Sequence, residues 1–417
     1  MNSLFTTPKI NKLSAIGLLI LVSAAVLHID WKAEASKDLH ATAATYELLE
    51  RPKAIQHGIE WRQVQESWSK YKVRLASNDA DPKAKLALAE LCVKEARVTG
   101  EHGYYYPMAL KLTDEVVLDA DAAKELQFYA LTLKAGVQLS LHEFAAARET
   151  GLQAQELNPH NAQICGVLTD AFVELGEYDK AIAMADRMVA IRPDLRSYSR
   201  VAYLREIFGQ VDGAIEALEM AITAGYPGDE ETTWAMLTLA DLSLEYGSPE
   251  KAASLYRQIL LDRPNYPFAV AGLAKVQWKQ GNYAEAEAGF EQAIKIIPEV
   301  GFYIDLATMK KELDQPYSYL IGDILQMLKE DTDAGHIMNM EYADIYYDLL
   351  EKPKEALEYL KIEHNIRPNN IDVNLRLAKV YHGLDSSAEA RLHLEAALIT
   401  DSKDPSIKEI TKAIATS

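Results

Sequence analysis

The chain has 417 residues, of which 49% are hydrophobic and 25% charged, with a formal net charge of −19 at pH 7. This composition is sufficient to bury a large core. The acidic balance argues against nucleic acid as a partner, because contact with phosphate groups requires a basic face.

Residues 1–35 predict a signal peptide or a signal-anchor. Lys9 and Lys12 precede an apolar run over residues 13–29, which is at the lower limit of the about 17–25 apolar residues that span a bilayer. Its small-residue cleavage candidates are weak, so cleavage and retention as an inner-membrane anchor both stay open. The lysines favour a cytoplasmic N-terminus, and we therefore expect the remainder to be exported to the periplasm or another extracytoplasmic compartment.

Residues 36–82 are expected to form a linker and a capping helix. Apolar side chains recur at helical spacing from Trp61 to Leu75, and the helix should end before Pro82. A helix of this kind covers the exposed first unit of a repeat array.

Residues 83–405 carry a repeat marked by a recurring alanine. Ala147, Ala181 and Ala214 are 34 and 33 residues apart. The same position is held further along the chain by Ala252, Ala286, Ala356 and Ala390. In the clearest copies a glycine lies five residues before the alanine, and a proline often lies twelve residues after it.

Residues 161–193 show the physical basis of one unit. Apolar side chains at helical spacing predict an amphipathic first helix that ends at Leu175. Gly176 follows, where a residue in the left-handed conformation ends a helix without a steric penalty. Ala181 allows the second helix to approach the first closely, and Pro193 cannot continue the second helix.

This order of glycine, alanine and proline, with a period of about 34 residues, resembles the tetratricopeptide repeat (TPR) family. The resemblance implies an all-α solenoid, a right-handed superhelix of antiparallel helix pairs with about nine repeats, some of them degenerate. Residues 406–417 are expected to form a C-terminal capping helix and tail. In the unit at 301–331, Gln315-Pro316 replaces the glycine turn, and Glu351 replaces the glycine of the next unit. We expect both units to stay helical.

The first unit departs most from this pattern. Residues 97–107 are longer than an ordinary turn and contain Tyr104, Tyr105 and Tyr106. We expect an inserted loop, which in repeat proteins often lies on a binding face. The alternative is a structural hairpin whose tyrosines pack on the neighbouring repeat.

Catalytic and cofactor motifs are absent from the sequence. We expect no enzyme activity, no cofactor and no metal site, and a hydrolase centred on His102 is a remote alternative. Cys92 and Cys165 fall in first helices about two repeats apart, beyond disulfide reach, and are predicted to be core residues.

In the TPR family the first helices line a concave groove that binds partners. Carried over by repeat position, the resemblance assigns partner contacts to Tyr203, Glu206, Trp234, Asp241, Phe268, Lys275, Trp278 and Lys279, with Asp170, Glu174 and Glu245 beside them. It implies a non-enzymatic scaffold for a protein or peptide partner in the cell envelope. The alternative is a helical solute- or glycan-binding envelope protein that uses the Tyr104–Tyr106 insertion and the groove tryptophans.

Overall fold

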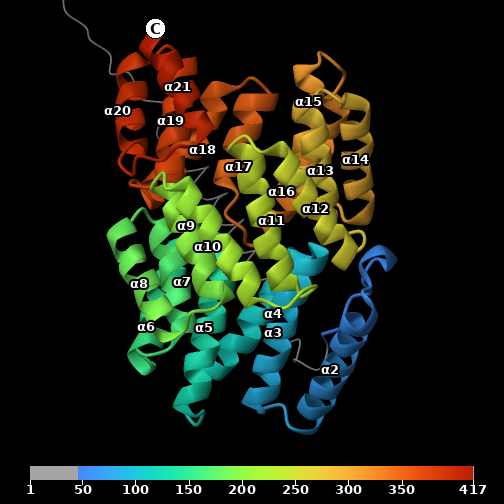
Figure 1. The fold of residues 1–417 in the computed structure, drawn as a ribbon. Helices are drawn as coiled ribbons and strands as arrows, with labels where there is room; N and C mark the ends of the chain where they lie inside the picture. Colours follow the sequence, from blue (N-terminus) through green and yellow to red (C-terminus); the bar gives the residue numbers. More distant parts are fainter. Residues whose placement is uncertain (1–45, 417) are drawn as a thin grey trace, which may run out of the picture.

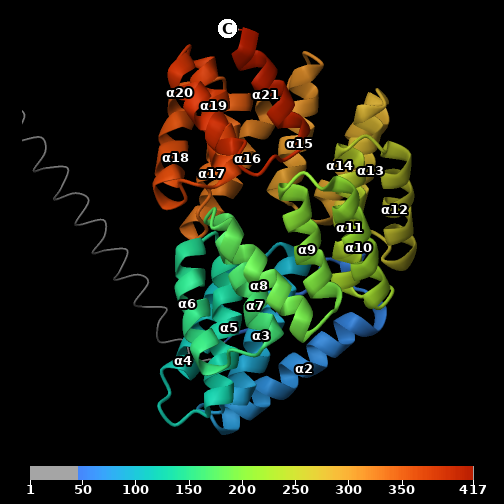
Figure 2. The same ribbon diagram turned by 60° about the vertical axis from the view of Figure 1, so that its left-hand side comes forward.

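The computed structural model describes residues 46–416, so the expected signal or anchor segment lies outside the described residues. Every regular element of the described part is helical, which confirms the predicted all-α class. No helix in residues 46–416 is long and apolar enough to cross a membrane. The helices stack side by side into a superhelix in which the C-terminal repeats lie against the N-terminal ones (Figures 1 and 2).

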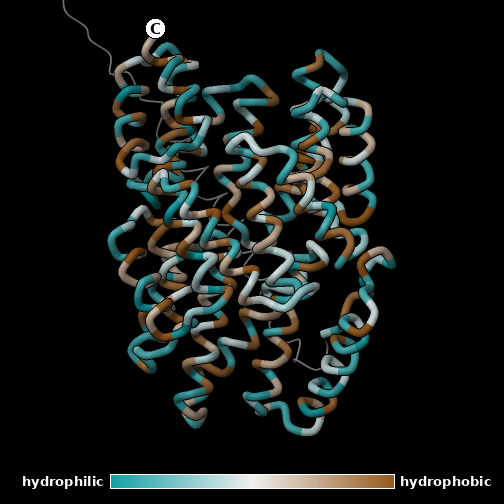
Figure 3. Tube along the Cα trace, viewed as in Figure 1, coloured by the Kyte–Doolittle hydropathy of each residue, from teal (hydrophilic) through white to brown (hydrophobic). Residues whose placement is uncertain are grey.

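Nine helix pairs form the body of the described chain. Their first and second helices are, in chain order, α3 (Pro82–Thr99) and α4 (His102–Val117), α5 (Lys124–Ser140) and α6 (Phe144–Leu157), α7 (Ala162–Glu174) and α8 (Tyr178–Ile191), α9 (Leu195–Ile207) and α10 (Val211–Ala224), α11 (Glu230–Glu245) and α12 (Pro249–Asp262), α13 (Pro267–Lys279) and α14 (Tyr283–Ile296), α15 (Val300–Glu312) and α16 (Ser318–Asp333), α17 (Asn339–Asp344) with the π-helical turn η3 (Ile345–Leu349) and α18 (Pro353–Ile366), and α19 (Ile371–Gly383) and α20 (Ser387–Ala397). The 3-10 turn η2 (Lys53–Ile55) and helix α2 (Gly58–Ser77) precede them, and α21 (Pro405–Thr416) follows. Hydrophobic and hydrophilic residues alternate along the individual helices, as amphipathic packing requires (Figure 3).

The recurring alanines lie where the two helices of a pair cross. Ala181, Ala214, Ala252 and Ala286 are all 0% exposed, as the repeat register predicts. Their small side chains allow the close approach that makes each pair a unit.

The turn within each pair requires one residue with a positive φ angle. Gly176 has φ 72° and Gly281 has φ 81°. Where the repeat lacks glycine, another residue takes the same conformation: Asp314 has φ 51° and Glu351 has φ 56°. The two degenerate units are therefore helical pairs like the others, as expected.

The expected loop insertion at residues 97–107 is wrong. Helix α3 continues to Thr99, Gly100 ends it with φ 78°, and α4 begins at His102. The three tyrosines therefore lie on a helix, which continues through Pro107. The first unit is an ordinary helix pair with a short turn.

The superhelix closes on itself along a contact that we call the seam. The turns inside the first four pairs, at residues 100–103, 141–142, 174–178 and 209, meet the loops that follow the last four pairs. These loops lie at residues 297–299, 334–337, 367–371 and 401–403. The C-terminal helices α18 to α20 consequently lie over α6 to α9 in both views (Figures 1 and 2).

Hydrogen bonds define the register of the seam. The Ile337 amide donates to the Leu141 carbonyl at 3.0 Å, and His142 Nδ1 donates to the Ile337 carbonyl at 2.9 Å. One repeat further on, Asn370 Nδ2 donates to the Glu174 carbonyl at 3.0 Å. These partners are 195 and 196 positions apart in the sequence, so one superhelical turn takes about six repeats of about 34 residues.

The expected N-terminal cap also takes part in this contact. Arg51 donates to the buried carboxylate of Glu95 at 2.6 and 2.7 Å and to Glu60 on α2 at 3.0 Å. Glu60 also accepts from Arg263, which lies after α12, at 2.9 Å. Helix α2 therefore covers α3 and at the same time reaches the following turn of the superhelix.

Candidate binding surface

First helices line the inner side of the superhelix. Successive first helices, from α3 and α5 to α13 and α15, pack on each other, whereas neighbouring second helices show no comparable contact in the described chain. The first helices therefore lie closer to the axis of the superhelix than the second helices do. Their side chains that point away from the second helices form the concave face, on which the sequence predicts partner contacts.

Ion pairs between adjacent repeats neutralise much of this face. Arg200 on α9 forms a two-bond contact with Asp170 on α7, at 2.9 and 2.6 Å. Lys275 on α13 lies 2.9 Å from Asp305 on α15. These charges hold neighbouring repeats together, so Lys275 is not a free cation.

One group of carboxylates forms no ion pair within residues 46–416, although Lys279 lies near Glu245 and Arg376 lies near Asp372. We call Glu206, Glu245, Asp372 and Asp404 the acidic patch. The carboxylate of Glu206 makes no hydrogen bond or ion pair within residues 46–416. Burial raises the pKa of Glu206 to about 7, and the carboxylates of Glu245, Asp404 and Asp372 add to the rise. Like charges brought together in this way oppose ionisation.

The acidic patch joins elements from both ends of the chain. Glu206 and Glu245 belong to α9 and α11, whereas Asp372 begins α19 and Asp404 precedes α21. Tyr203 stands beside this patch with 40% of its surface exposed, and its hydroxyl lies 3.4 Å from Glu174. Tyr203 and Glu206 both lie on α9, and the sequence gave no sign that the C-terminal repeats bring two more carboxylates next to them.

An aromatic surface lies on the next two first helices. Trp234 on α11 is 45% exposed, and its ring meets Phe268 edge-on with centroids 5.9 Å apart. Phe268 packs in turn against Phe302 at 5.5 Å. The guanidinium of Arg97 lies 5.9 Å from the centre of the Trp234 ring. Trp234 therefore offers exposed surface to a partner, whereas Phe268 mainly supports the Trp234 ring from within the fold.

Three predicted contact residues are engaged within the fold. Trp278 is half-buried, and its Nε1 donates to Glu312 at 3.0 Å. Lys279 Nζ donates to the Leu244 carbonyl at 3.2 Å. Asp241 accepts a hydrogen bond from Tyr256 at 2.5 Å. Each of these hydrogen bonds is made to another residue of the helix stack. The bonded polar groups are therefore not free to contact a partner.

The tyrosine run is mostly interior. Tyr105 and Tyr106 are 0% and 3% exposed, which removes both from any partner surface of this conformation. The Tyr105 hydroxyl accepts from the Leu49 amide at 3.0 Å, and the Tyr104 hydroxyl donates to the Glu47 carbonyl at 3.0 Å. Two of the tyrosines are therefore packed inside, as the alternative expected, although on a helix and not in a hairpin. Tyr104 and Tyr105 hold the segment before α2.

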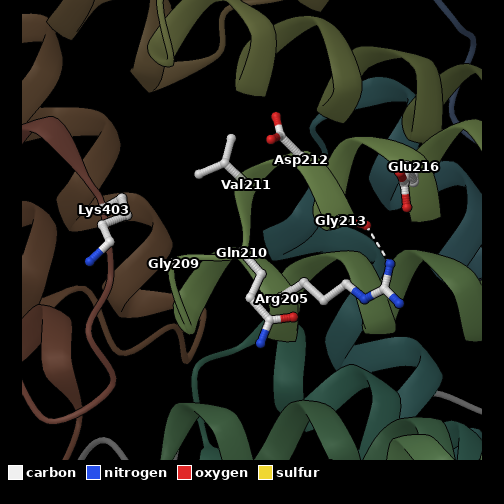
Figure 4. Close-up of a pocket in the computed structure, with 8 residues that line it drawn as sticks. All are labelled: Arg205, Gly209, Gln210, Val211, Asp212, Gly213, Glu216 and Lys403. Atoms are coloured by element: carbon white, nitrogen blue, oxygen red, sulfur yellow. Dashed lines mark hydrogen bonds between the residues drawn. The ribbon is translucent and has the colours of Figure 1, made fainter.

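Two cavities open along the seam. The first, of about 570 Å³, is lined by Arg205, Gly209, Gln210, Val211, Asp212, Gly213, Glu216 and Lys403 (Figure 4). Arg205 turns back on its own repeat and donates to the Gly213 carbonyl at 2.7 Å, while Lys403 approaches from the loop before α21. The second, of about 540 Å³, lies between the start of α4 and helices α15 and α16. Both cavities show that the two turns of the superhelix meet without filling all the space between them.

Histidines meet at the middle of the seam. His102 stacks on Tyr106 with ring centroids 5.2 Å apart and lies 5.6 Å from His336. Burial and the neighbouring His102 and His142 lower the pKa of His336 to about 4. His102 is thus packed between Tyr106 and His336 at the start of α4. No group of three His, Cys, Asp or Glu residues in the described chain is placed to hold a metal ion.

Comparison with known proteins agrees with this architecture. A tetratricopeptide repeat family model matches residues 243–300. Cellulose synthase 1 operon protein C of Komagataeibacter xylinus is 28% identical over 160 residues, which is 36% of this chain and 12% of that protein. The chain thus spans only a small part of the length of this curated relative.

Solved structures of similar fold include several TPR proteins. A thermophilic TPR protein of Thermus thermophilus is 20% identical, with 49% of this chain and 98% of that chain covered and a TM-score of 0.39. PilF of Pseudomonas aeruginosa is 16% identical, with 56% and 99% covered and a TM-score of 0.39. At these identities the likeness concerns the fold alone. The family match over residues 243–300 shows that the chain carries tetratricopeptide repeats, and the nine helix pairs of the described chain repeat the same architecture.

Proposed function

We propose that the chain is a non-enzymatic scaffold of the cell envelope that binds a protein or peptide on the inner face of its superhelix. The observation that carries this proposal is the exposed Trp234 on the same helix, α11, as Glu245 of the acidic patch. Large aromatic side chains that are exposed in the free protein are frequent anchors of binding. At about 1.5 Å per helical residue, roughly 16 Å separates the two side chains along α11.

The charge of this face selects the partner. Glu206 and the other carboxylates of the acidic patch favour a segment with arginine or lysine, because opposite charges across an interface raise association rates and exclude wrong partners. Trp234 favours an apolar side chain next to that basic segment. The partner is therefore expected to be an extended peptide or protein loop with both features.

An envelope location is supported by the apolar run at residues 13–29, which lies outside the described residues. The curated relative is a product of a cellulose synthase operon. We propose that the run directs the repeats out of the cytoplasm, either as a cleaved signal or as a retained anchor.

The solute- or glycan-binding alternative loses one of its two supports in the structure. The tyrosine run that it requires is packed against the segment before α2, with Tyr105 fully buried. A glycan array compared with a pull-down from envelope extract separates the two functions, since the scaffold predicts captured protein and no glycan signal.

The proposal is tested by a pull-down with Trp234→Ala. Truncation of an aromatic anchor costs at least about 2 kcal/mol of binding, which is roughly thirtyfold in affinity. A matched control is Tyr319→Ala on the second helix α16, because Tyr319 is 59% exposed but belongs to a helix outside the inner face. A partner that is recovered equally by wild type and Trp234→Ala would move the binding site elsewhere.

A further inference from the structure

The loop between α18 and α19 carries an arginine that is bound across the seam by Glu174, at the end of the first helix α7, and by Phe144, at the start of α6, while Glu363 of its own helix α18 holds it from behind. Arg367 is 7% exposed. Its Nη1 donates to Glu174 at 2.6 Å and its Nε donates to Glu363 at 2.5 Å. The guanidinium also lies 4.7 Å from the centre of the Phe144 ring. Two carboxylates and an aromatic face are the surroundings in which a protein binds an arginine of a partner.

Glu174 belongs to the surface on which we place the partner. It ends α7, and its carboxylate lies 3.4 Å from the hydroxyl of Tyr203. The neighbouring Asn370 donates to the Glu174 carbonyl at 3.0 Å, and the Ile371 amide donates to the Tyr178 hydroxyl at 3.0 Å. The loop at 367–371 therefore covers the end of the inner face next to Tyr203.

A second arginine supports this interpretation. Arg263, in the loop after α12, is 3% exposed and donates to Glu60 across the same seam at 2.9 Å. Each of these arginines precedes a proline that ends a repeat. Arg192 precedes such a proline too, but it lies outside the seam, and it pairs with Asp194 of its own loop while remaining largely exposed. An arginine before a repeat proline is therefore buried only at the two positions, 263 and 367, where one turn of the superhelix meets the other.

We propose that the Arg367 loop is an autoinhibitory contact: it occupies the acidic inner face in place of a basic segment of the partner, and it holds the superhelix closed. This inference rests on the proposed function and specifies its regulation. An arginine-containing partner segment competes for Glu174, and binding requires the two turns of the superhelix to part along the seam.

The contacts at the seam are suited to such an exchange. A buried ion pair gains little net free energy, because loss of hydration offsets the attraction between its charges. Asp372 and Asp404 come from the C-terminal side of the seam and face Glu206 and Glu245, and like charges on the two sides oppose closure. Arg376 beside Asp372 and Lys279 beside Glu245 offset part of this repulsion. The apolar part of this contact includes Ile371, which packs in the cluster that contains Phe172 and Tyr178. Attraction and repulsion are thus opposed within one surface, and a ligand that favours the open state can shift the balance.

The seam can be locked by a disulfide for a direct test. A Cβ atom built at Gly103 would lie 3.0 Å from the Ala334 Cβ, and a small relaxation brings this pair to the disulfide range of about 3.5–4.5 Å. The native Cys92 and Cys165 are both buried and unpaired, so they do not compete. The variant Gly103→Cys/Ala334→Cys is closed when oxidised and can open when reduced.

The experiment measures binding of a fluorescent octa-arginine peptide at physiological ionic strength to the full-length chain. Arg367→Gln is compared with Arg74→Gln, which removes the same charge but breaks a pair with Asp81 between α2 and the start of α3, away from the acidic patch. If at most about a tenth of the wild-type molecules are open, release of the loop tightens apparent binding by about tenfold or more. We expect this gain for Arg367→Gln only, and we expect the oxidised cysteine variant to bind more weakly than its reduced form.

Equal affinity of Arg367→Gln and Arg74→Gln, or equal binding by the oxidised and reduced cysteine variants, would overturn the proposal. The cysteine comparison keeps Arg367 in place and decides the question even if Arg367→Gln folds poorly. If these comparisons fail while Trp234→Ala still loses its partner, only the autoinhibition is wrong. If they succeed while Trp234→Ala binds its partner normally, the autoinhibitory contact is supported and the aromatic contact of the proposed function is wrong.

Discussion

Replacement of single turn glycines distinguishes a closed superhelix from an open one. Gly176 and Gly281 both end a first helix, with φ angles of 72° and 81°. A Cβ atom at Gly176 would collide with the backbone of Asn369 across the seam, whereas a Cβ atom at Gly281 would meet nothing within 4 Å. Alanine at either position carries the same local conformational cost, and only alanine at Gly176 disturbs the seam.

The expected magnitudes follow from these two contributions. An alanine in the left-handed conformation costs about 1–2 kcal/mol, and this is the whole effect expected for Gly281→Ala. A forced backbone shift at a packed contact adds about 1–3 kcal/mol, so Gly176→Ala should lose about 2–5 kcal/mol in total. Gly209→Ala should behave like Gly176→Ala, since its Cβ atom would collide with the Asp401 carbonyl.

Urea unfolding followed by circular dichroism measures both variants against wild type. The midpoint of Gly176→Ala should fall further than that of Gly281→Ala. Equal midpoints for the two variants would show that the turn at Gly176 is free in solution, and the closed superhelix would then be wrong.

Three further outcomes are expected. Ala252→Leu should lower stability by about 1–3 kcal/mol in thermal unfolding, because Ala252 is 0% exposed at its helix crossing; an unchanged melting temperature would contradict the repeat register. The folded-state pKa of Glu206, about 7, lies above its ordinary value of 4.5, so the folded protein binds more protons than the unfolded chain between these values and loses stability as pH rises through 7. Glu206→Gln should therefore raise the melting temperature above pH 7 and leave it unchanged below pH 4.5, and a constant difference across this range would contradict the assignment. A reporter enzyme that works only after export, fused after residue 60, should be active, whereas a stable but inactive fusion would contradict export.

The repeat units could be predicted from the sequence because each one is local. The spacing of Ala181 and Ala214 defines the helix crossings, and the glycines five residues earlier define the turns. The register also predicts that Glu351 replaces glycine, and Glu351 has φ 56°. In the unit at 301–331 it does not, because Asp314 takes the left-handed conformation one residue before the expected Gln315-Pro316. The first unit misled the prediction since Pro107 resembled the end of a loop, although Gly100 already marked the end of α3.

The seam could not be predicted in the same way. Its partners, such as Glu174 and Arg367, are 193 positions apart, and their meeting depends on a small rotation per repeat that accumulates over the superhelix. Arginine precedes the repeat proline at 263 and 367, but it does so at 192 too, where it stays exposed, so this pattern does not identify the seam. For the binding surface, repeat position alone did not separate the exposed Trp234 from Trp278, which is tied to Glu312 of the next repeat.

Formation of the disulfide between cysteines at positions 103 and 334 tests the closed superhelix most directly. These residues are far apart in the sequence and come together only if the start of α4 lies against the end of α16, where the Cβ positions are 3.0 Å apart. Mass spectrometry of the oxidised Gly103→Cys/Ala334→Cys monomer should find the two peptides linked within one chain. Two free thiols, or a link formed only between chains, would contradict the account.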